Sequence, residues 1–175
     1  PGNYEVKMGT PFTELLDMAG GVWKGRKLKA VIPGGPSTAV LPAEAILSAN
    51  MDYDSLSKAR SSLGAGSMIV MDETTCMVKT LHRLSYFFYE ESCGQCTPCR
   101  EGTGWVYRVI DRIVHGKGKM EDLDLLTSVS NNIAGRTICA LGEAAATPVL
   151  SFIKHFRHEF EYYIQHGKSM VEGKE

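Results

Sequence analysis

The sequence carries almost no net charge, because 19 lysines and arginines nearly balance 20 aspartates and glutamates to give a formal charge of -1. Proteins that bind nucleic acid usually concentrate basic charge, so the composition gives no electrostatic reason to expect a nucleic-acid partner. Long apolar runs are also absent. The longest, such as residues 67–71, are far too short to cross a bilayer, and the N-terminus lacks a signal-peptide pattern. We therefore expect a soluble protein without direct membrane contact, in the cytoplasm or on the matrix side in a mitochondrion.

Residue sets that mark common enzyme classes are missing as well. No serine, histidine and aspartate, and no cysteine and histidine, have the arrangement of a nucleophilic site. The sequence therefore predicts no catalytic side chain. The histidines lack metal-ligand spacing relative to one another, so surface positions are expected for all five: His82, His115, His155, His158 and His166.

Cysteine is scarce and unevenly placed. Five cysteines is an odd number, and four of them fall in two short segments. This arrangement favours metal binding in a reducing compartment over a disulfide framework. The fifth, Cys76, lies at the start of a helical pattern, and we expect it to be a small buried apolar side chain.

The four remaining cysteines have the spacing of a metal centre. Cys93, Cys96 and Cys99 recur at every third position, and Cys139 follows much later in the chain. A cubane 4Fe-4S cluster needs one thiolate for each iron, which three clustered cysteines and one remote cysteine supply. Tetrahedral zinc also takes four thiolates, but its usual framework is two separated C-x2-C pairs. The spacing favours the cluster, with structural zinc, and disulfides or unpaired thiols, as alternatives.

The residues around the third cysteine predict the start of a helix. Thr97 reads as the N-cap and Pro98 as the first helical residue, where a missing N–H costs nothing. Cys99 would then lie in the first turn, close to free N–H groups and the positive end of the helix dipole, which stabilise thiolates. Arg100 adds a positive charge beside it, although a solvated Arg100 without a role at the site is an equal alternative.

The first part of the chain predicts mixed α and β structure. Its amphipathic helix opens at Thr10-Pro11 and closes at Gly20-Gly21. Short strands are predicted at residues 4–8, 28–32, 39–41 and 67–71. A helix crossing a small mixed sheet is the expected architecture.

The second part predicts four amphipathic helices. Asp72-Glu73-Thr74 supplies the N-cap signal of the first helix, and Thr147-Pro148 supplies that of the fourth. Four helices with short connections predict a bundle, in whose core we expect Trp105 and Phe87. In an up-down-up-down bundle, the first and third connections lie at the same end, so the two cysteine segments meet there. The apolar stripes are Met77, Leu81, Leu84 and Phe88; Trp105, Val106, Val109, Ile110 and Ile113; Leu123, Leu126, Val129 and Ile133; and Val149, Ile153, Phe156 and Phe160.

These patterns give an α+β fold class with two domains. The predicted boundaries are a small domain at residues 1–72, a four-helix metal-binding domain at residues 73–166, and a polar tail at residues 167–175.

The sequence resembles the NADH-oxidising flavoprotein (51 kDa-type) subunit of respiratory complex I, and the related subunits of NAD-reducing hydrogenases and NAD-dependent formate dehydrogenases. Two stretches carry the resemblance, Glu91-Ser92-Cys93-Gly94-Gln95-Cys96-Thr97-Pro98-Cys99-Arg100-Glu101-Gly102 and Thr137-Ile138-Cys139-Ala140-Leu141-Gly142. It extends from Pro1 to about Tyr163. It implies a ubiquitin-like β-grasp module of the soluble-ligand-binding type before the bundle, and a 4Fe-4S cluster that takes electrons from a reduced flavin.

One motif of that family is missing. The glycine-rich flavin and NADH site, typically Gly-Arg-Gly-Gly-Ala-Gly-Phe-Pro, does not occur in the sequence. The chain therefore resembles the C-terminal portion of such a subunit. By this resemblance FMN and NADH bind in an N-terminal part, and the chain alone is not expected to oxidise NADH.

The leading hypothesis is an electron-transfer module of an NADH:quinone oxidoreductase. By the resemblance, its partners are the N-terminal flavin domain, a small 2Fe-2S thioredoxin-like subunit and a large iron–sulfur subunit. They would form a peripheral arm on the cytoplasmic or matrix side of the membrane. The resemblance also implies that Ala140, Leu141 and Gly142 lie near FMN. Arg100 and Arg136 are candidates for tuning the cluster's potential, since positive charge favours the reduced state. The alternative function is a non-catalytic binding module with a structural metal site.

Overall fold

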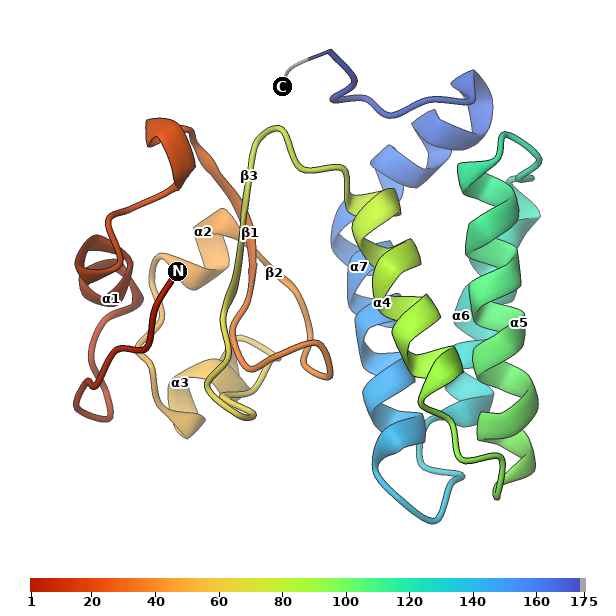
Figure 1. The fold of residues 1–175 in the computed structure, drawn as a ribbon, viewed down its shortest axis with the longest axis horizontal. Coiled ribbons are helices and arrows are strands. Elements are labelled where there is room, and N and C mark those ends of the chain that lie inside the picture. Colours follow the sequence, from red (N-terminus) through yellow and green to blue (C-terminus); the bar gives the residue numbers. More distant parts are fainter. Residues whose placement is uncertain (174–175) are drawn as a thin grey trace. The chain divides into compact units, whose positions relative to one another are not determined.

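The computed structural model describes residues 1–173, and these form two compact units, Pro1–Thr75 and a second unit that begins at Cys76. The α+β class predicted from the sequence is confirmed, because a small sheet is followed by a run of long helices (Figure 1). Among the described residues, no helix is both long enough and apolar enough to cross a membrane.

The first unit is built on a three-stranded antiparallel sheet of order β2-β1-β3. The central strand, β1 (Leu28–Ile32), lies at the predicted position and pairs with β2 (Leu41–Pro42) and β3 (Ile69–Asp72). The helices of the unit are short: α1 (Phe12–Met18), the 3-10 turn η1 (Trp23–Gly25), α2 (Ala43–Ile46) and α3 (Tyr53–Lys58). Buried residues of α1, α2 and α3 form the core together with Val31 and Leu41 of the sheet.

Two expectations for this unit are wrong. The sheet is purely antiparallel rather than mixed. The predicted strand at residues 4–8 is not a strand, because no other strand of the described chain pairs with it. Only Val6 of that segment packs against the core, while its neighbours are exposed. A strand pattern therefore exists there without a hydrogen-bonding partner.

The second unit is a bundle of four helices, α4 (Met77–Glu90), α5 (Thr97–Val114), α6 (Glu121–Ile133) and α7 (Leu141–His166). Helix α4 packs on α5 and α7, and α6 packs on the same two helices. Each predicted stripe supplies buried core residues, including Leu81, Ile110, Leu123 and Phe160. The first and third connections lie at the same end of the bundle, as predicted, at the bottom of Figure 1.

Helices α5 and α7 differ in the size of their core residues between the two ends of the bundle. Near the cysteine-bearing connections, the buried positions of α5 and α7 are small: Gly102, Thr103, Gly142, Ala145 and Ala146. Towards the other end they are large, as in Ile113, Phe156 and Phe160. Along α5 and α7, apolar burial and the stability that it provides are therefore concentrated away from the cysteines, and the large buried residues at the cysteine end come from α4 and α6, as Phe88 and Ile133.

An ion pair joins the connection between α5 and α6. Arg112 donates two hydrogen bonds to the buried carboxylate of Asp122, and the Lys119 backbone N–H donates a third over 2.8 Å. Desolvation alone would raise the pKa of Asp122, but these hydrogen bonds outweigh it and lower the pKa. The carboxylate therefore stays ionised to a lower pH than an exposed aspartate does.

The predicted start of the fourth helix is wrong. Helix α7 begins at Leu141, so Thr147 and Pro148 lie inside it rather than at its N-terminus. Alanines at 144–146 are strong helix formers and extend the helix upstream, and Thr147 uses its hydroxyl to donate to the Glu143 carbonyl at 2.9 Å. The helix departs from regular geometry at Phe156, where φ is -126° and ψ is 22°.

The first helix of the bundle also starts later than its predicted cap. Cys76 is the N-cap of α4, with its side chain half-buried rather than buried. The Asp72 carboxylate instead accepts from the Thr74 N–H at 2.9 Å, which closes a turn at the end of β3. A free backbone N–H at the N-terminus of α4 finds its hydrogen-bond acceptor in a distant part of the chain, since the Met77 N–H donates to the Glu159 carboxylate of α7.

Two aromatic side chains expected in the core lie on the surface. Trp105 is 52% exposed and Phe87 is 45% exposed. Each is next to a residue that takes the buried position, Val106 in α5 and Phe88 in α4. A helical step of one residue turns a side chain by about 100°, which is enough to move it out of the core.

Candidate metal centre

The first cysteine segment is a tight turn between α4 and α5. Gly94 has a φ of +77°, a left-handed conformation that glycine adopts without the strain of a Cβ. Cys93 is exposed, Cys96 is half-buried and Cys99 is buried. The turn thus presents its cysteines at three depths along the start of α5.

Helix α5 begins one residue earlier than predicted. Cys96, in extended conformation, is its N-cap, and Thr97 and Pro98 are its first two helical residues. The helix starts earlier because the Arg100 N–H donates the first helical hydrogen bond to the carbonyl of Cys96, not to that of Thr97, over 2.8 Å. Pro98 remains in the first turn, where its missing N–H has no intrahelical partner to lose.

The second cysteine segment leads into α7. Cys139 is exposed and stands directly before Ala140, the N-cap residue of α7. Thr137 donates from its hydroxyl to the Cys139 carbonyl over 2.9 Å. A Cβ on Gly142 would lie 2.5 Å from Thr137 Oγ1, so only glycine at this position lets the loop fold against the helix. The backbone around Cys139 is therefore fixed by local contacts.

The structure brings the two segments together. The backbone N–H of Ile138 donates to Cys96 Sγ over 3.3 Å, a contact between residues 42 positions apart. The residue next to Cys139 thus touches a sulfur of the first segment. Sequence analysis did not identify this contact, because backbone donors carry no residue signature.

A hydroxyl that contacts a second cysteine sulfur was also missed. Ser92 Oγ lies 3.2 Å from Cys99 Sγ, within hydrogen-bonding distance. The only signal in the sequence is that a hydroxyl residue precedes Cys93. The hydroxyl contacts Cys99, seven positions further on. This pairing depends on the geometry of the turn and cannot be predicted from the spacing of the residues alone.

Helix N-termini supply positive potential to the site. Helices α5 and α7 both begin at the cysteine segments, with Cys96 as the N-cap of one and Cys139 just before the N-cap of the other. Unpaired N–H groups and the positive ends of the helix dipoles therefore gather where thiolates would carry negative charge.

The two arginines named from the sequence differ in their contacts. Arg100 is half-exposed, pairs with Glu101 through Nε at 3.0 Å, and donates from Nη1 to the Gly94 carbonyl at 3.0 Å. Its charge is thereby partly offset, and its clearest role is to hold the turn. Arg136 is exposed beside the second segment. Of the residues that the resemblance puts near FMN, Ala140 and Leu141 lie at the very start of α7 beside Cys139, with buried Gly142 after them.

The donor set has the chemistry of a cubane cluster. All four candidate ligands are cysteines, and each iron of a 4Fe-4S cluster takes one thiolate. Three of them lie on one turn and the fourth on the facing segment, so the ligands come as a triplet and a single residue rather than as the two C-x2-C pairs that usually bind zinc.

Comparisons with known proteins agree with both units. Residues 79–163 match the family described as the NADH-ubiquinone oxidoreductase-F iron-sulfur binding region, and residues 1–41 match the SLBB domain. The chain is 53% identical over 167 residues to the NADH-quinone oxidoreductase F subunit of Rickettsia bellii (strain OSU 85-389), covering 94% of this chain and 40% of the relative. Identity to the corresponding F subunit of Rhodobacter capsulatus is 48%, covering 94% of this chain and 39% of that relative.

A solved structure has the same fold. The NAD+-reducing [NiFe]-hydrogenase in the H2-reduced state contains a chain that superposes with a TM-score of 0.84 at 29% identity, covering 97% of this chain and 28% of that one. The chain therefore spans about 40% of the length of the curated relatives that it matches, and a smaller share of the hydrogenase chain.

Proposed function

Because the chain belongs to the family of NADH-quinone oxidoreductase F subunits, we propose that its helical bundle holds a 4Fe-4S cluster through Cys93, Cys96, Cys99 and Cys139 and serves in electron transfer. One observation carries the proposal: the Ile138 N–H bonds to Cys96 Sγ, so the two cysteine segments share one end of the bundle. That end is also where α5 and α7 begin.

The protein's own groups have distinct parts in this proposal. A bound 4Fe-4S cluster would supply one-electron redox chemistry. The four thiolates would hold it, and the N-termini of α5 and α7 would stabilise its negative charge. The Ile138 N–H donates to Cys96 Sγ, and the Ser92 hydroxyl would donate to Cys99 Sγ once that sulfur is a thiolate. Both hydrogen bonds would orient the sulfurs and favour the more negative, reduced state.

The wider reaction belongs to the whole subunit. In the proposed arrangement, FMN and NADH would bind in the N-terminal flavin domain, and Ala140 and Leu141, beside Cys139, would lie near the flavin. The partners that would receive electrons are a small 2Fe-2S thioredoxin-like subunit and a large iron–sulfur subunit, with quinone as the final acceptor. Support comes from the relatives, which are named as NADH-quinone oxidoreductase subunits. Such an assembly would form a peripheral arm on the cytoplasmic or matrix side of a membrane.

The test is metal analysis of the chain purified without oxygen. We expect a brown protein with about four irons and four acid-labile sulfides per chain. Cys139→Ser should lose most of this iron, whereas Cys76→Ser should keep it, because Cys76 lies at the start of α4, away from both segments. A colourless protein with one zinc per chain would overturn the proposal.

A further inference from the structure

The loop between α6 and α7, residues 134–140, is closed at its base by one side chain. Gly135 follows the C-cap residue of α6 and has a φ of +68°, a left-handed conformation that glycine adopts without strain. Its backbone N–H donates to Oε2 of Glu143, in the first turn of α7, over 2.7 Å. Glu143 therefore joins the end of one helix to the start of the next across the loop that carries Cys139.

The hydrogen bond at the base of the loop sets its shape. The N–H groups of Ala134 and Arg136, on either side of Gly135, donate to carbonyls of α6, whereas the Gly135 N–H donates across the loop. A hydrogen bond to a charged acceptor is stronger than one between neutral groups. Gly135 and Glu143 are both exposed, however, so water competes for each of them. We therefore expect the bond to matter for the loop rather than for the stability of the bundle.

Further contacts connect the base of the loop to the cysteines. Within the loop, the Thr137 hydroxyl donates to the Cys139 carbonyl over 2.9 Å. At its tip, the Ile138 N–H donates to Cys96 Sγ over 3.3 Å. The three contacts follow one another along a short stretch of backbone, so a loop that opens at its base would also move Cys139 and its neighbour Ile138.

Two physical effects of Glu143 can be separated. Its negative charge in the first turn of α7 favours the helix through the dipole, and its oxygen accepts the hydrogen bond that closes the loop. A glutamine side chain keeps an oxygen that accepts hydrogen bonds but carries no charge. Glu143→Gln therefore keeps the second effect and removes the first, whereas Glu143→Ala removes both.

We propose that Glu143 is a positioning residue for the fourth ligand: its carboxylate holds the loop closed, so that Cys139 stands beside the first cysteine segment before any cluster is inserted. The proposal deepens the proposed function and rests on it for the group that Cys139 binds. The shape of the loop is a property of the metal-free chain, so it can be measured without iron.

Amide hydrogen exchange of the metal-free chain, resolved by residue, is the first test. Glu143→Ala should speed exchange at Gly135 by about fivefold, because the acceptor is lost. It should also speed exchange at Ile138, whose N–H donates to Cys96 and not to Glu143. Glu143→Gln should exchange like the parent at both positions. Parent exchange in Glu143→Ala, or faster exchange at Gly135 alone, would overturn the proposal, since the base would then not control the tip.

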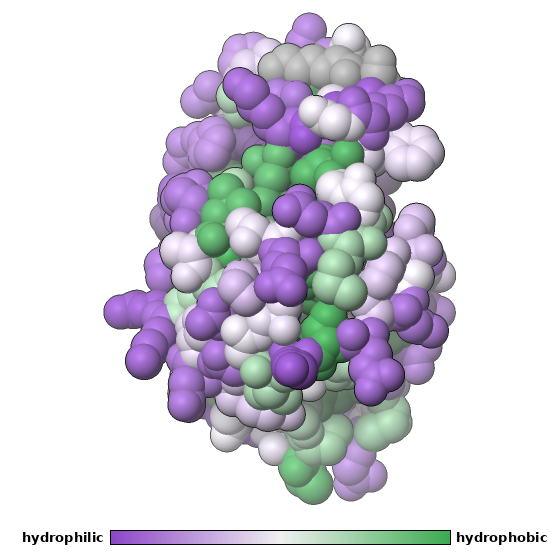
Figure 2. Space-filling view, turned by 90° about the vertical axis from the view of Figure 1, so that its left-hand side faces the viewer, coloured by the Kyte–Doolittle hydropathy of each residue, from purple (hydrophilic) through white to green (hydrophobic). Residues whose placement is uncertain are grey.

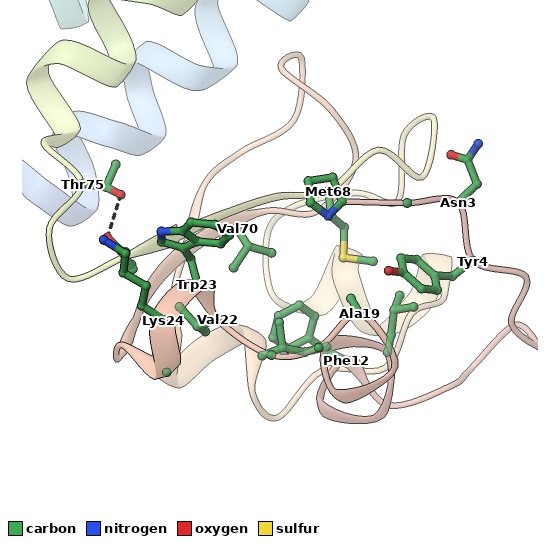
Figure 3. A pocket seen from close by; sticks show the side chains of 18 of the residues that line it. Asn3, Tyr4, Phe12, Ala19, Val22, Trp23, Lys24, Met68, Val70 and Thr75 are labelled. Atoms are coloured by element: carbon green, nitrogen blue, oxygen red, sulfur yellow. Dashed lines mark hydrogen bonds between the residues drawn. The ribbon is translucent and has the colours of Figure 1, made fainter.

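A dye that binds apolar surface would not measure loop opening, because the first unit has apolar surface of its own. A hollow of about 870 Å³ lies there, and Phe12, Met68 and Val70 are among the residues that line it (Figure 3). Figure 2 also shows hydrophobic patches, in green, on one face of the molecule. Such a dye would bind these surfaces whether the loop is open or closed.

Iron uptake is the second test. During anaerobic reconstitution with iron and sulfide, Glu143→Ala should take up iron about fivefold more slowly than the parent, since fewer chains present Cys139 in the closed loop. Glu143→Gln should restore the parent rate. Glu121→Ala is the matched control, because it removes the same carboxylate from the first turn of α6, at the other end of the bundle (Figure 1), and it should leave exchange and uptake unchanged.

The outcomes distinguish this proposal from the proposed function. Parent uptake by Glu143→Ala, or slow uptake by Glu143→Gln as well, would overturn the positioning role of Glu143 while the cluster itself remains. A parent chain that binds no iron would overturn the proposed function. The exchange of the metal-free chain would then still decide whether Glu143 holds the loop closed.

Discussion

Replacing Ser92 by alanine tests how the protein sets the potential of the proposed cluster. Ser92 Oγ lies 3.2 Å from the sulfur of buried Cys99, so little water can replace the lost hydrogen bond. A hydrogen bond to a charged group contributes about 1.5–3 kcal/mol. We take about 1 kcal/mol of this as gained on reduction, when the centre carries one more negative charge. Since about 1.4 kcal/mol corresponds to 59 mV for a one-electron couple, Ser92→Ala should lower the midpoint potential by about 40 mV.

The assay is a redox titration of the anaerobically purified chain, followed by electron paramagnetic resonance of the reduced cluster. Ser92→Thr keeps the hydroxyl and should stay near the parent potential. Thr97→Ala removes a hydroxyl whose neighbour is Arg100 rather than a sulfur, and it should also stay near the parent. If Ser92→Ala has the parent potential while its cluster is intact, the hydrogen bond does not tune the cluster and the reasoning is refuted.

Three further predictions concern the loops and the bundle. Arg100→Ala should lower the potential by less than Ser92→Ala does, because Arg100 is half-exposed and paired; a larger drop in the same titration would contradict this. Gly142→Ala should reduce iron per chain, and adding Thr137→Gly should restore it by removing the clash; full iron in the single variant would contradict the assigned packing. The lowered pKa of Asp122 means that its stabilising effect is present above about pH 4 and is lost as pH falls through the folded-state pKa. Asp122→Asn should therefore destabilise the bundle by about 1–3 kcal/mol at pH 7 and flatten its loss of stability in acid, measured by urea unfolding across pH; an unchanged acid profile would exclude this role.

Local sequence patterns predicted the elements whose stability is local. The strand at 28–32 and the helical stripes were found because apolar periodicity decides which face of each element is buried. The cysteine spacing likewise identified the candidate ligands, and the bundle order predicted that their two segments share one end.

Features that depend on distant contacts were not predicted. The N-terminus of α4 is satisfied by Glu159, far along the chain, so the local cap signal at Asp72 was misleading. The strand pattern at residues 4–8 requires a neighbour that the described chain does not supply. Trp105 shows the limit of periodicity, because a residue adjacent to the stripe fits the pattern nearly as well as its true members.

The small residues at the cysteine end of the bundle have a consequence for assembly. With Gly102, Ala145 and Ala146 in place of large apolar side chains, the beginnings of α5 and α7 gain little from burial. Metal ligation would then supply much of the stability of this end of the bundle, because it would link the two cysteine segments to one centre. Iron-starved protein should accordingly open first at this end, exchanging the amide hydrogens of residues 93–104 and 136–146 long before those around Ile113 and Phe160.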